Sequence, residues 1–381
     1  MLSRLLDDGV LTCPVCRGPT DDGLRNAPLE LDSVYAETVA GEVLQGQLRC
    51  SACGTRYPVI DGVACVFSDT RAWLRREERA VMGRSDLHPA LAGFLSEAWG
   101  ESEDPSWRRQ LLSVYGRRLP GMMPTGPAES VMARLQEEGD GALDAARGRL
   151  VSADDLVLDA GCGVGVGSLA LVEKGARVVA FDQDFTALRL LGRLLRDGVV
   201  EVPTWGAGGA DFGVQQAVLE DRAAVGRVAL VAGDVLDPPF AGGVFDGVVA
   251  MNLLDNVAEP VMAVRQLHGM VRKGGRLLVA SPFDWAERAT ARGARLGDGL
   301  RLSDGATDPV PVLHALLEGR LLDVAPEVAC EVTQAADVPW VLVRHDRSAH
   351  VFVTHVVEAV RAGGIPSTNG APSDRFAATS P

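Results

Sequence analysis

The stretch at residues 157–167 reads VLDAGCGVGVG, a short apolar run with an acid, followed by glycines at alternate positions. Glycine adopts backbone conformations with positive φ and lets a ligand approach the main chain closely. A glycine-rich turn directly after a buried strand is therefore typical of nucleotide binding. The stretch predicts a nucleotide site and leaves open which nucleotide it takes.

The chain around this turn alternates short apolar segments with amphipathic ones. Strands are predicted at LVLDA (156–160), ARVVAFD (176–182), RVALVAGD (227–234), FDGVVAMN (245–252) and GGRLLVASP (274–282). Helical segments such as FTALRLLGRLLRDG (185–198) separate them. This order predicts an α/β fold with a doubly wound, Rossmann-like parallel sheet. Long segments at 199–226 and 281–309 interrupt the alternation, and such insertions commonly form substrate sites.

Three nucleotide classes compete for the glycine turn. A phosphate-binding P-loop is excluded because no Gly-Lys-Ser/Thr closes the turn. A dinucleotide fingerprint needs GxGxxG or GxGxxA directly after the strand, and from Gly161 the sixth position is Val166. Residues 165–170 fit GxGxxA but begin four positions late, so the dinucleotide class is a weaker alternative.

The third class fits the register of the turn. The segment resembles the D/E-x-G-x-G-x-G signature of class I S-adenosylmethionine-dependent methyltransferases, matched by Asp159, Gly161, Gly163 and Gly165. The resemblance implies that these residues hold the methyl donor. It also implies donor contacts from the residues that end the next three strands, namely Asp182, Asp234, Val235 and Asn252.

Two CxxC pairs lie near the N-terminus, at Cys13/Cys16 and Cys50/Cys53. Four thiolates in two such pairs can surround one tetrahedral Zn²⁺, leaving no position for a catalytic water. The pattern predicts a structural zinc site. A redox dithiol and a chance spacing are the alternatives.

The segments LTCPVCRGP and LRCSACGTRYPVIDGVACV resemble the small zinc-ribbon proteins that activate tRNA and protein methyltransferases. The match includes Cys53, Gly54, Tyr57, Pro58, Asp61 and Gly62, whereas Ala64 stands where the family usually has proline. The resemblance implies a methyltransferase partner, which in this chain would be fused to the ribbon. We expect a zinc ribbon at 1–68, a helical linker or cap at 69–150, a methyltransferase domain at 151–362 and a disordered tail at 363–381.

Charge and hydropathy limit the partners of the protein. The formal net charge of −14 disfavours a general affinity for nucleic acid, which requires clustered positive charge. The sequence lacks an apolar run of the roughly 18 residues that a membrane helix needs. Two aspartates lie near the N-terminus, where a signal peptide would be apolar. We expect a cytoplasmic protein without membrane contact, and the sequence leaves its oligomeric state open.

The methyl acceptor has to be read from the segments beyond the glycine turn. Residues 250–290 are similar to the methyltransferase domain of ovothiol-biosynthesis enzymes and, more loosely, to carnosine-type N-methyltransferases. Residues 337–350 correspond to a further motif of these enzymes, with His345 in place of an acid. The resemblance favours Trp285, Trp340 and Arg344 as acceptor contacts.

The side chains themselves allow both functional and structural roles. Trp285 and Trp340 could form an aromatic wall or belong to the core, and Arg344 could clamp a carboxylate or form a surface ion pair. His345 is the preferred general base because a neutral imidazole accepts a proton near pH 7.

The sequence therefore predicts methyl transfer from S-adenosylmethionine to a heteroatom of a small molecule or peptide, nitrogen above all. A histidine derivative is the favoured acceptor. One alternative is an rRNA or tRNA methyltransferase that recognises its substrate through the ribbon. The other is a scaffold that binds the donor and activates a partner methyltransferase.

Overall fold

A computed structural model describes residues 1–17, 19–20, 23–24, 27–81, 86–97, 114–122, 126–205, 212–220, 225–287, 289–302, 307–321 and 329–362. The tail expected at 363–381 lies outside these residues. Within the described part of the chain, no helix is long and apolar enough to cross a membrane.

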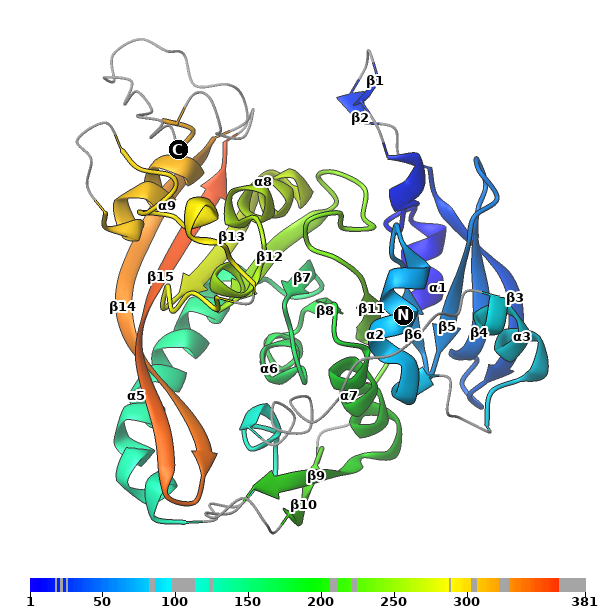
Figure 1. Ribbon diagram of the computed structural model, residues 1–381, viewed down its shortest axis with the longest axis horizontal. Helices are drawn as coiled ribbons and strands as arrows, with labels where there is room; N and C mark the ends of the chain where they lie inside the picture. The colour runs from blue at the N-terminus through cyan, green and yellow to red at the C-terminus, as the bar shows by residue number, and fades with distance from the viewer. Residues whose placement is uncertain are drawn as a thin grey trace.

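One large mixed sheet runs through the molecule (Figure 1). The described strands of this sheet follow one another in the order β14 (Cys330–His345), β15 (Ser348–Arg361), β13 (Val271–Ser281), β12 (Phe245–Met251), β7 (Leu156–Ala160), β8 (Arg177–Asp182), β11 (Val228–Ala232), β6 (Val63–Cys65), β5 (Arg56–Ile60), β4 (Val43–Cys50) and β3 (Leu29–Glu37). The five strands predicted from 156 to 282 are all present as β7, β8, β11, β12 and β13, and they pair in parallel. The α/β, doubly wound fold class is confirmed.

Antiparallel strands extend the expected parallel sheet at both ends: β3 to β6 at the ribbon end, and β14 and β15 at the other. β15 pairs antiparallel with β13, and β14 pairs antiparallel with β15. The two strands form a long hairpin that turns between His345 and Ser348. The hairpin extends past the level of Ser281, the last residue of β13, and runs beside the long helix α5 (Pro127–Leu150; Figure 1). We call the part of the hairpin beyond that level, residues 338–354, the arm.

Helices cover both faces of the sheet and bury two hydrophobic clusters. One cluster includes side chains of α1 (Leu2–Asp7), α8 (Pro260–Met270) and α9 (Pro309–Leu317). The other includes side chains of α2 (Thr70–Val81), α3 (Pro89–Glu97), α5, α6 (Val166–Glu173) and α7 (Phe185–Asp197). Short 3₁₀ turns lie at Pro14–Cys16, Leu254–Asn256 and Arg292–Ala294.

Among the described strands, two pairs lie outside the large sheet. The first insertion contains a hairpin of β9 (Val199–Trp205) and β10 (Phe212–Val218). β1 (Pro19–Thr20) and β2 (Gly23–Leu24) form a small hairpin between the two cysteine pairs. The first insertion is thus more regular than its glycine content indicates.

The N-terminal strands belong to the same sheet as the glycine turn. β6 pairs in parallel with β11, with Val63 opposite Leu230 and Cys65 opposite Ala232. All three residues of β6 are completely buried. The ribbon therefore covers β11, the edge strand of the parallel sheet, in its own chain. The sequence alone leaves open whether the ribbon contacts its own methyltransferase domain or another.

Candidate active site and metal centre

The glycine turn follows β7 and is held against β8. The backbone N–H groups of Gly161 and Cys162 donate to the carbonyl of Phe181 over 2.8 and 3.2 Å. Gly161, Gly163 and Gly165 have φ values of +74°, +54° and +87°, a region that side chains with a Cβ rarely adopt. This backbone conformation explains the three glycines of the motif.

The surroundings of the three glycines differ. A Cβ at Gly161 would lie 2.9 Å from Leu253 and one at Gly165 only 2.3 Å from Leu191, so these two glycines allow close packing. A Cβ at Gly163 would meet no described atom within 4 Å. Gly163 therefore faces open space, as expected where a ligand lies against the main chain.

Asp182 ends β8 beside the turn. Its carboxylate accepts hydrogen bonds of 2.8 Å from the N–H groups of Gly163 and Asp184. Burial raises the pKa of Asp182 to about 6, because desolvation disfavours the charged form more than these two donors favour it. The Asp182 carboxylate is placed to accept hydrogen bonds from the hydroxyl groups of a ribose.

Asp159 is only 3% exposed and lies beneath the turn. Its carboxylate accepts a 2.6 Å hydrogen bond from Ser168 on α6. Burial raises the pKa of Asp159, while Ser168 and the nearby Arg147 of α5 oppose the rise. These contacts indicate that Asp159 supports the turn from below. Arg147, in the linker segment, was not singled out from the sequence.

Asp234 and Val235 follow β11. The Asp234 carboxylate accepts a 2.9 Å hydrogen bond from the N–H of Leu236, which fixes the start of the loop, and Val235 is largely buried. Asn252 follows β12 with a φ of +53°, and its Oδ1 is buried without a hydrogen-bond partner among the described residues. An orphaned buried acceptor and a strained backbone are both features of functional sites.

Polar side chains also lie beside Asn252. Asp255 is 3% exposed and 3.3 Å from the hydroxyl of Ser281, and burial raises the pKa of Asp255 to about 6. Phe283, two residues after β13, has a φ of +53°, and its ring centroid is 6.1 Å from that of Trp285. The segments NLLDN and SPFDW thus meet at the carboxyl ends of β12 and β13.

The remaining predicted acceptor residues lie on the arm. Trp340 packs its ring against Phe352 at 5.4 Å, and Arg344 is exposed. His345 stands at the turn of the hairpin, where its Nδ1 accepts from the N–H of Arg347. Trp285 belongs to the cluster of α8 and α9, whereas Trp340 belongs to that of α5 to α7. Among the described contacts, none joins the two tryptophans.

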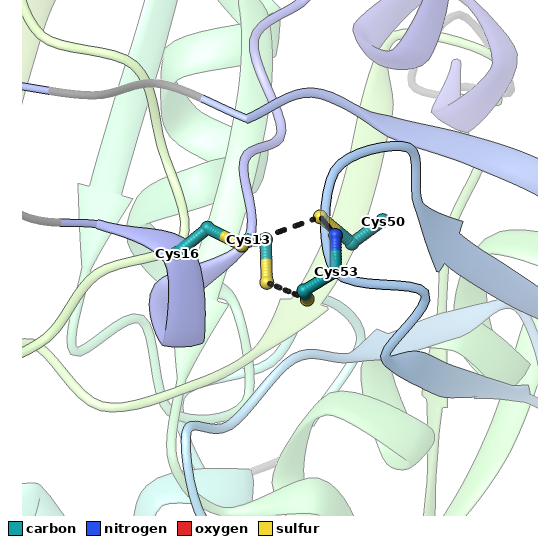
Figure 2. Close-up of side chains that lie close together, drawn as sticks. All are labelled: Cys13, Cys16, Cys50 and Cys53. Atoms are coloured by element: carbon teal, nitrogen blue, oxygen red, sulfur yellow. Dashed lines mark hydrogen bonds between the residues drawn. The ribbon is translucent and has the colours of Figure 1, made fainter.

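The four cysteines predicted to bind metal meet at one point, although they come from two separate segments (Figure 2). The Sγ atoms of Cys13 and Cys53 are 3.8 Å apart, those of Cys16 and Cys50 are 3.7 Å apart, and all four lie within 4.8 Å of one another. A tetrahedral Zn²⁺ with Zn–S distances of about 2.3 Å requires sulfurs about 3.8 Å apart. The cluster fits this ion.

Hydrogen-bond donors surround the cysteine cluster. The hydroxyls of Tyr57 and Thr55 lie 3.0 Å from the sulfurs of Cys13 and Cys53. The N–H groups of residues 52 and 53 lie 3.4 Å from the sulfur of Cys50. Burial raises the pKa of Tyr57 far above its usual range, so its hydroxyl stays protonated and can donate a hydrogen bond to a thiolate. Such donors orient metal-bound thiolates.

The comparisons with known proteins agree with both parts of the site. Residues 158–279 match the family described as methyltransferase domain, and residues 9–62 match the family described as Trm112p-like protein. The chain carries a class I S-adenosylmethionine-dependent methyltransferase domain. A Trm112-like ribbon with four clustered cysteines precedes this domain.

Individual relatives cover only part of the chain. A demethylmenaquinone methyltransferase of Thermobifida fusca (strain YX) is 31% identical over 149 residues, which is 38% of this chain and 52% of the relative. One of Clavibacter sepedonicus is 30% identical over 33% of this chain and 41% of its own. The chain spans about half the length of these curated relatives or less.

A solved complex of the Trm112 methyltransferase activator of Haloferax volcanii with its methyltransferase is also similar. The identity is 13%, the TM-score is 0.37, and the match covers 62% of this chain and 94% of that one.

Proposed function

We propose that the protein transfers the methyl group of S-adenosylmethionine to a heteroatom of a small molecule or peptide, with nitrogen as the acceptor atom. A histidine derivative is the acceptor that the sequence favours. The observation that carries the proposal is the orphaned Oδ1 of Asn252, which directly precedes Leu253, the residue whose side chain lies against Gly161 of the glycine turn.

The donor supplies a methyl group on a positively charged sulfur, which leaves as a neutral thioether. The protein has to hold the donor, align the acceptor and exclude water. Gly161, Gly163 and Gly165 would lie against the donor, Asp182 would accept from its ribose, and Asp234 with Val235 would border its adenine. Asn252 would contact the donor or the acceptor, and Trp285 would border the acceptor. Trp340 and Arg344 lie on the arm, so they would contact only an acceptor that extends along it.

The contacts of the ribbon with the rest of the chain favour a structural role for it over substrate recognition. We propose that its cysteines bind one Zn²⁺ and that the partner it supports is the methyltransferase domain of its own chain. β6 uses its hydrogen bonds on β11, and Arg17 donates to the backbone carbonyl of Phe240 over 2.9 Å. The net charge of −14 disfavours the RNA alternative.

A second acceptor class has support from the relatives, which are named demethylmenaquinone methyltransferases. A quinol acceptor would place the new methyl on a ring carbon. The histidine class and the quinol class therefore differ in the acceptor atom, and a product analysis separates them.

The test is a transfer assay with methyl-labelled S-adenosylmethionine and the full zinc-loaded chain. Separate reactions contain L-histidine, carnosine, reduced demethylmenaquinone, a small-molecule cell extract, a peptide digest and total RNA. We expect label in the small-molecule or peptide reactions, on nitrogen. Label confined to RNA, or to a ring carbon of the quinol, would overturn the proposed acceptor class.

A further inference from the structure

Two histidines and an aspartate form a hydrogen-bonded chain beside the proposed acceptor site. Nε2 of His314 on α9 lies 3.0 Å from Nε2 of His355 on β15. Nδ1 of His355 lies 2.6 Å from the carboxylate of Asp337 on β14. The His355 side chain is 11% exposed and that of Asp337 is 64% exposed. The chain thus runs from a partly buried imidazole to a carboxylate in contact with solvent.

The carboxylate determines the proton positions. An ionised Asp337 only accepts hydrogen bonds, so Nδ1 of His355 carries a proton. Nε2 of the neutral His355 is then an acceptor, and Nε2–H of His314 donates to it. One further proton can bind at Nδ1 of His314, the ring nitrogen that then carries none, and the positive charge is balanced by the carboxylate. This arrangement takes up and releases one proton.

The sheet register places His355 two strands away from Asn252, at the same level of the sheet. Ser281, His355 and Asp337 are direct cross-strand partners on β13, β15 and β14, so their side chains lie on the same face. Met251 on β12 pairs with Ala280 on β13, so the next residue, Asn252, lies level with Ser281. Two strand spacings, about 10 Å, therefore separate the backbones of Asn252 and His355. An acceptor of the size of a modified amino acid spans that distance.

We propose that the His314–His355 pair, oriented by Asp337, receives the proton that the methyl acceptor loses. The proposal rests on the proposed function and assigns the general base to this pair. The acceptor lone pair forms the bond to the methyl carbon, and the carbon–sulfur bond breaks with its electrons going to sulfur. The N–H proton of the acceptor binds at Nδ1 of His314. His314 passes its Nε2 proton to Nε2 of His355, and His355 passes its Nδ1 proton to Asp337, from which it leaves to water.

The charges around the pair are consistent with a base. Burial lowers the pKa of His314, and the neighbouring His355 lowers it further. Glu318 opposes the shift, whereas Arg320 adds to it. Asp337 faces His355 from β14, while Ser281 and Asp255 lie toward β12. His314 is therefore neutral at pH 7 and can accept a proton.

The first test follows the histidine ring nitrogens of the full zinc-loaded chain by ¹⁵N NMR between pH 5 and 8.5. We expect His314 and His355 to titrate together, with Nδ1 of His355 protonated throughout. Asp337→Asn should remove that tautomer preference. Independent titration of the two rings, or an unchanged tautomer in Asp337→Asn, would overturn the proposal. A second bound zinc that His355→Gln removes would also overturn it, because the pair would then be a metal site.

The second test measures methyl transfer from labelled donor into the small-molecule extract at several pH values. We expect His355→Gln to lower the rate at least tenfold and to flatten the fall in rate at acidic pH. The affinity of the variant for S-adenosylhomocysteine, the product formed from the donor, should stay unchanged. His350→Gln on the same strand is the matched control and should behave like the wild-type chain. A His355→Gln variant with the wild-type rate and pH profile would overturn the proposal.

The two tests distinguish a failure of the proposed methyltransferase function from a failure of the proposed proton relay. A wild-type chain that methylates nothing in the extract would contradict the proposed small-molecule function. The NMR titration would still decide whether the pair shares a proton. A chain that is active while its histidines titrate independently would retain the proposed function and lose the relay.

Discussion

Asp61 and Arg189 form a 2.6 Å ion pair that joins the ribbon to α7 of the methyltransferase domain. Arg196, on the same helix, donates to the backbone carbonyl of Asp61 over 3.0 Å. The Asp61 side chain is 14% exposed and that of Arg189 is 33% exposed, so solvent screens the pair only in part. The contact lies beside the β6–β11 pairing and fixes the end of the ribbon.

A double-mutant cycle on Asp61→Asn and Arg189→Gln should give a coupling energy of about 1 kcal/mol in the free energy of unfolding. The measurement is urea unfolding of the full chain. The exposed pair of Arg301 and Asp298 is the control and should give a smaller value. Additive effects of the Asp61 and Arg189 changes would contradict a stabilising contact at this boundary.

The cysteine cluster predicts one zinc per chain. Cys13→Ser removes one of four ligands and should lower both the zinc content and the melting temperature, because binding energy of structural zinc is folding energy. Cys330→Ala, a buried cysteine outside the cluster, should keep one zinc. Elemental analysis and thermal unfolding test this prediction. A metal-free wild-type chain with unchanged thermal stability would refute it.

Gly163→Ala should weaken donor binding by about tenfold or more while changing stability by about 1 kcal/mol. The added methyl group would enter the open space where we expect the donor. Gly226→Ala is the matched control, since Gly226 also has a positive φ, of +84°, with no described atom near its Cβ position. The rise in melting temperature caused by S-adenosylhomocysteine should be clearly smaller in Gly163→Ala and unchanged in Gly226→Ala. Equal losses in both variants would mean that backbone strain alone is responsible.

Donor affinity should depend on pH through Asp182. The pKa of Asp182 is about 6 in the donor-free chain, so its carboxylate is ionised above that pH and protonated below it. Ribose hydroxyls donate to the ionised form, so affinity should be constant above about pH 7 and fall as the pH drops through 6. Asp182→Asn should bind more weakly with no such fall. Fluorescence titration from pH 5 to 8 tests this, and an equal fall in Asp182→Asn would assign it to another group.

The sequence predicts those parts of the molecule that depend on local pattern. The glycine turn and the five parallel strands were predicted because both depend on patterns within a few residues. A turn with positive φ requires glycine, and a short apolar segment indicates a buried strand. The cysteine pairs were equally readable, since each CxxC is a local unit. Their meeting across the intervening 33 residues follows from the geometry that a tetrahedral ion imposes.

Contacts set by the register of distant strands were not predictable. Asp337, His314 and His355 come together only because β14 and β15 pair antiparallel beside β13, and that pairing has no local signature. Histidines recur at every fifth residue at 345, 350 and 355. The arm separates them, leaving His345 at the hairpin turn and His355 level with Ser281.

The central claim is that the turn at residues 161–165 holds S-adenosylmethionine. Isothermal titration calorimetry of the full zinc-loaded chain with S-adenosylhomocysteine at pH 8 tests this most directly. We predict one binding site per chain. The absence of binding heat at two temperatures, with a folded and zinc-loaded protein, would contradict the claim.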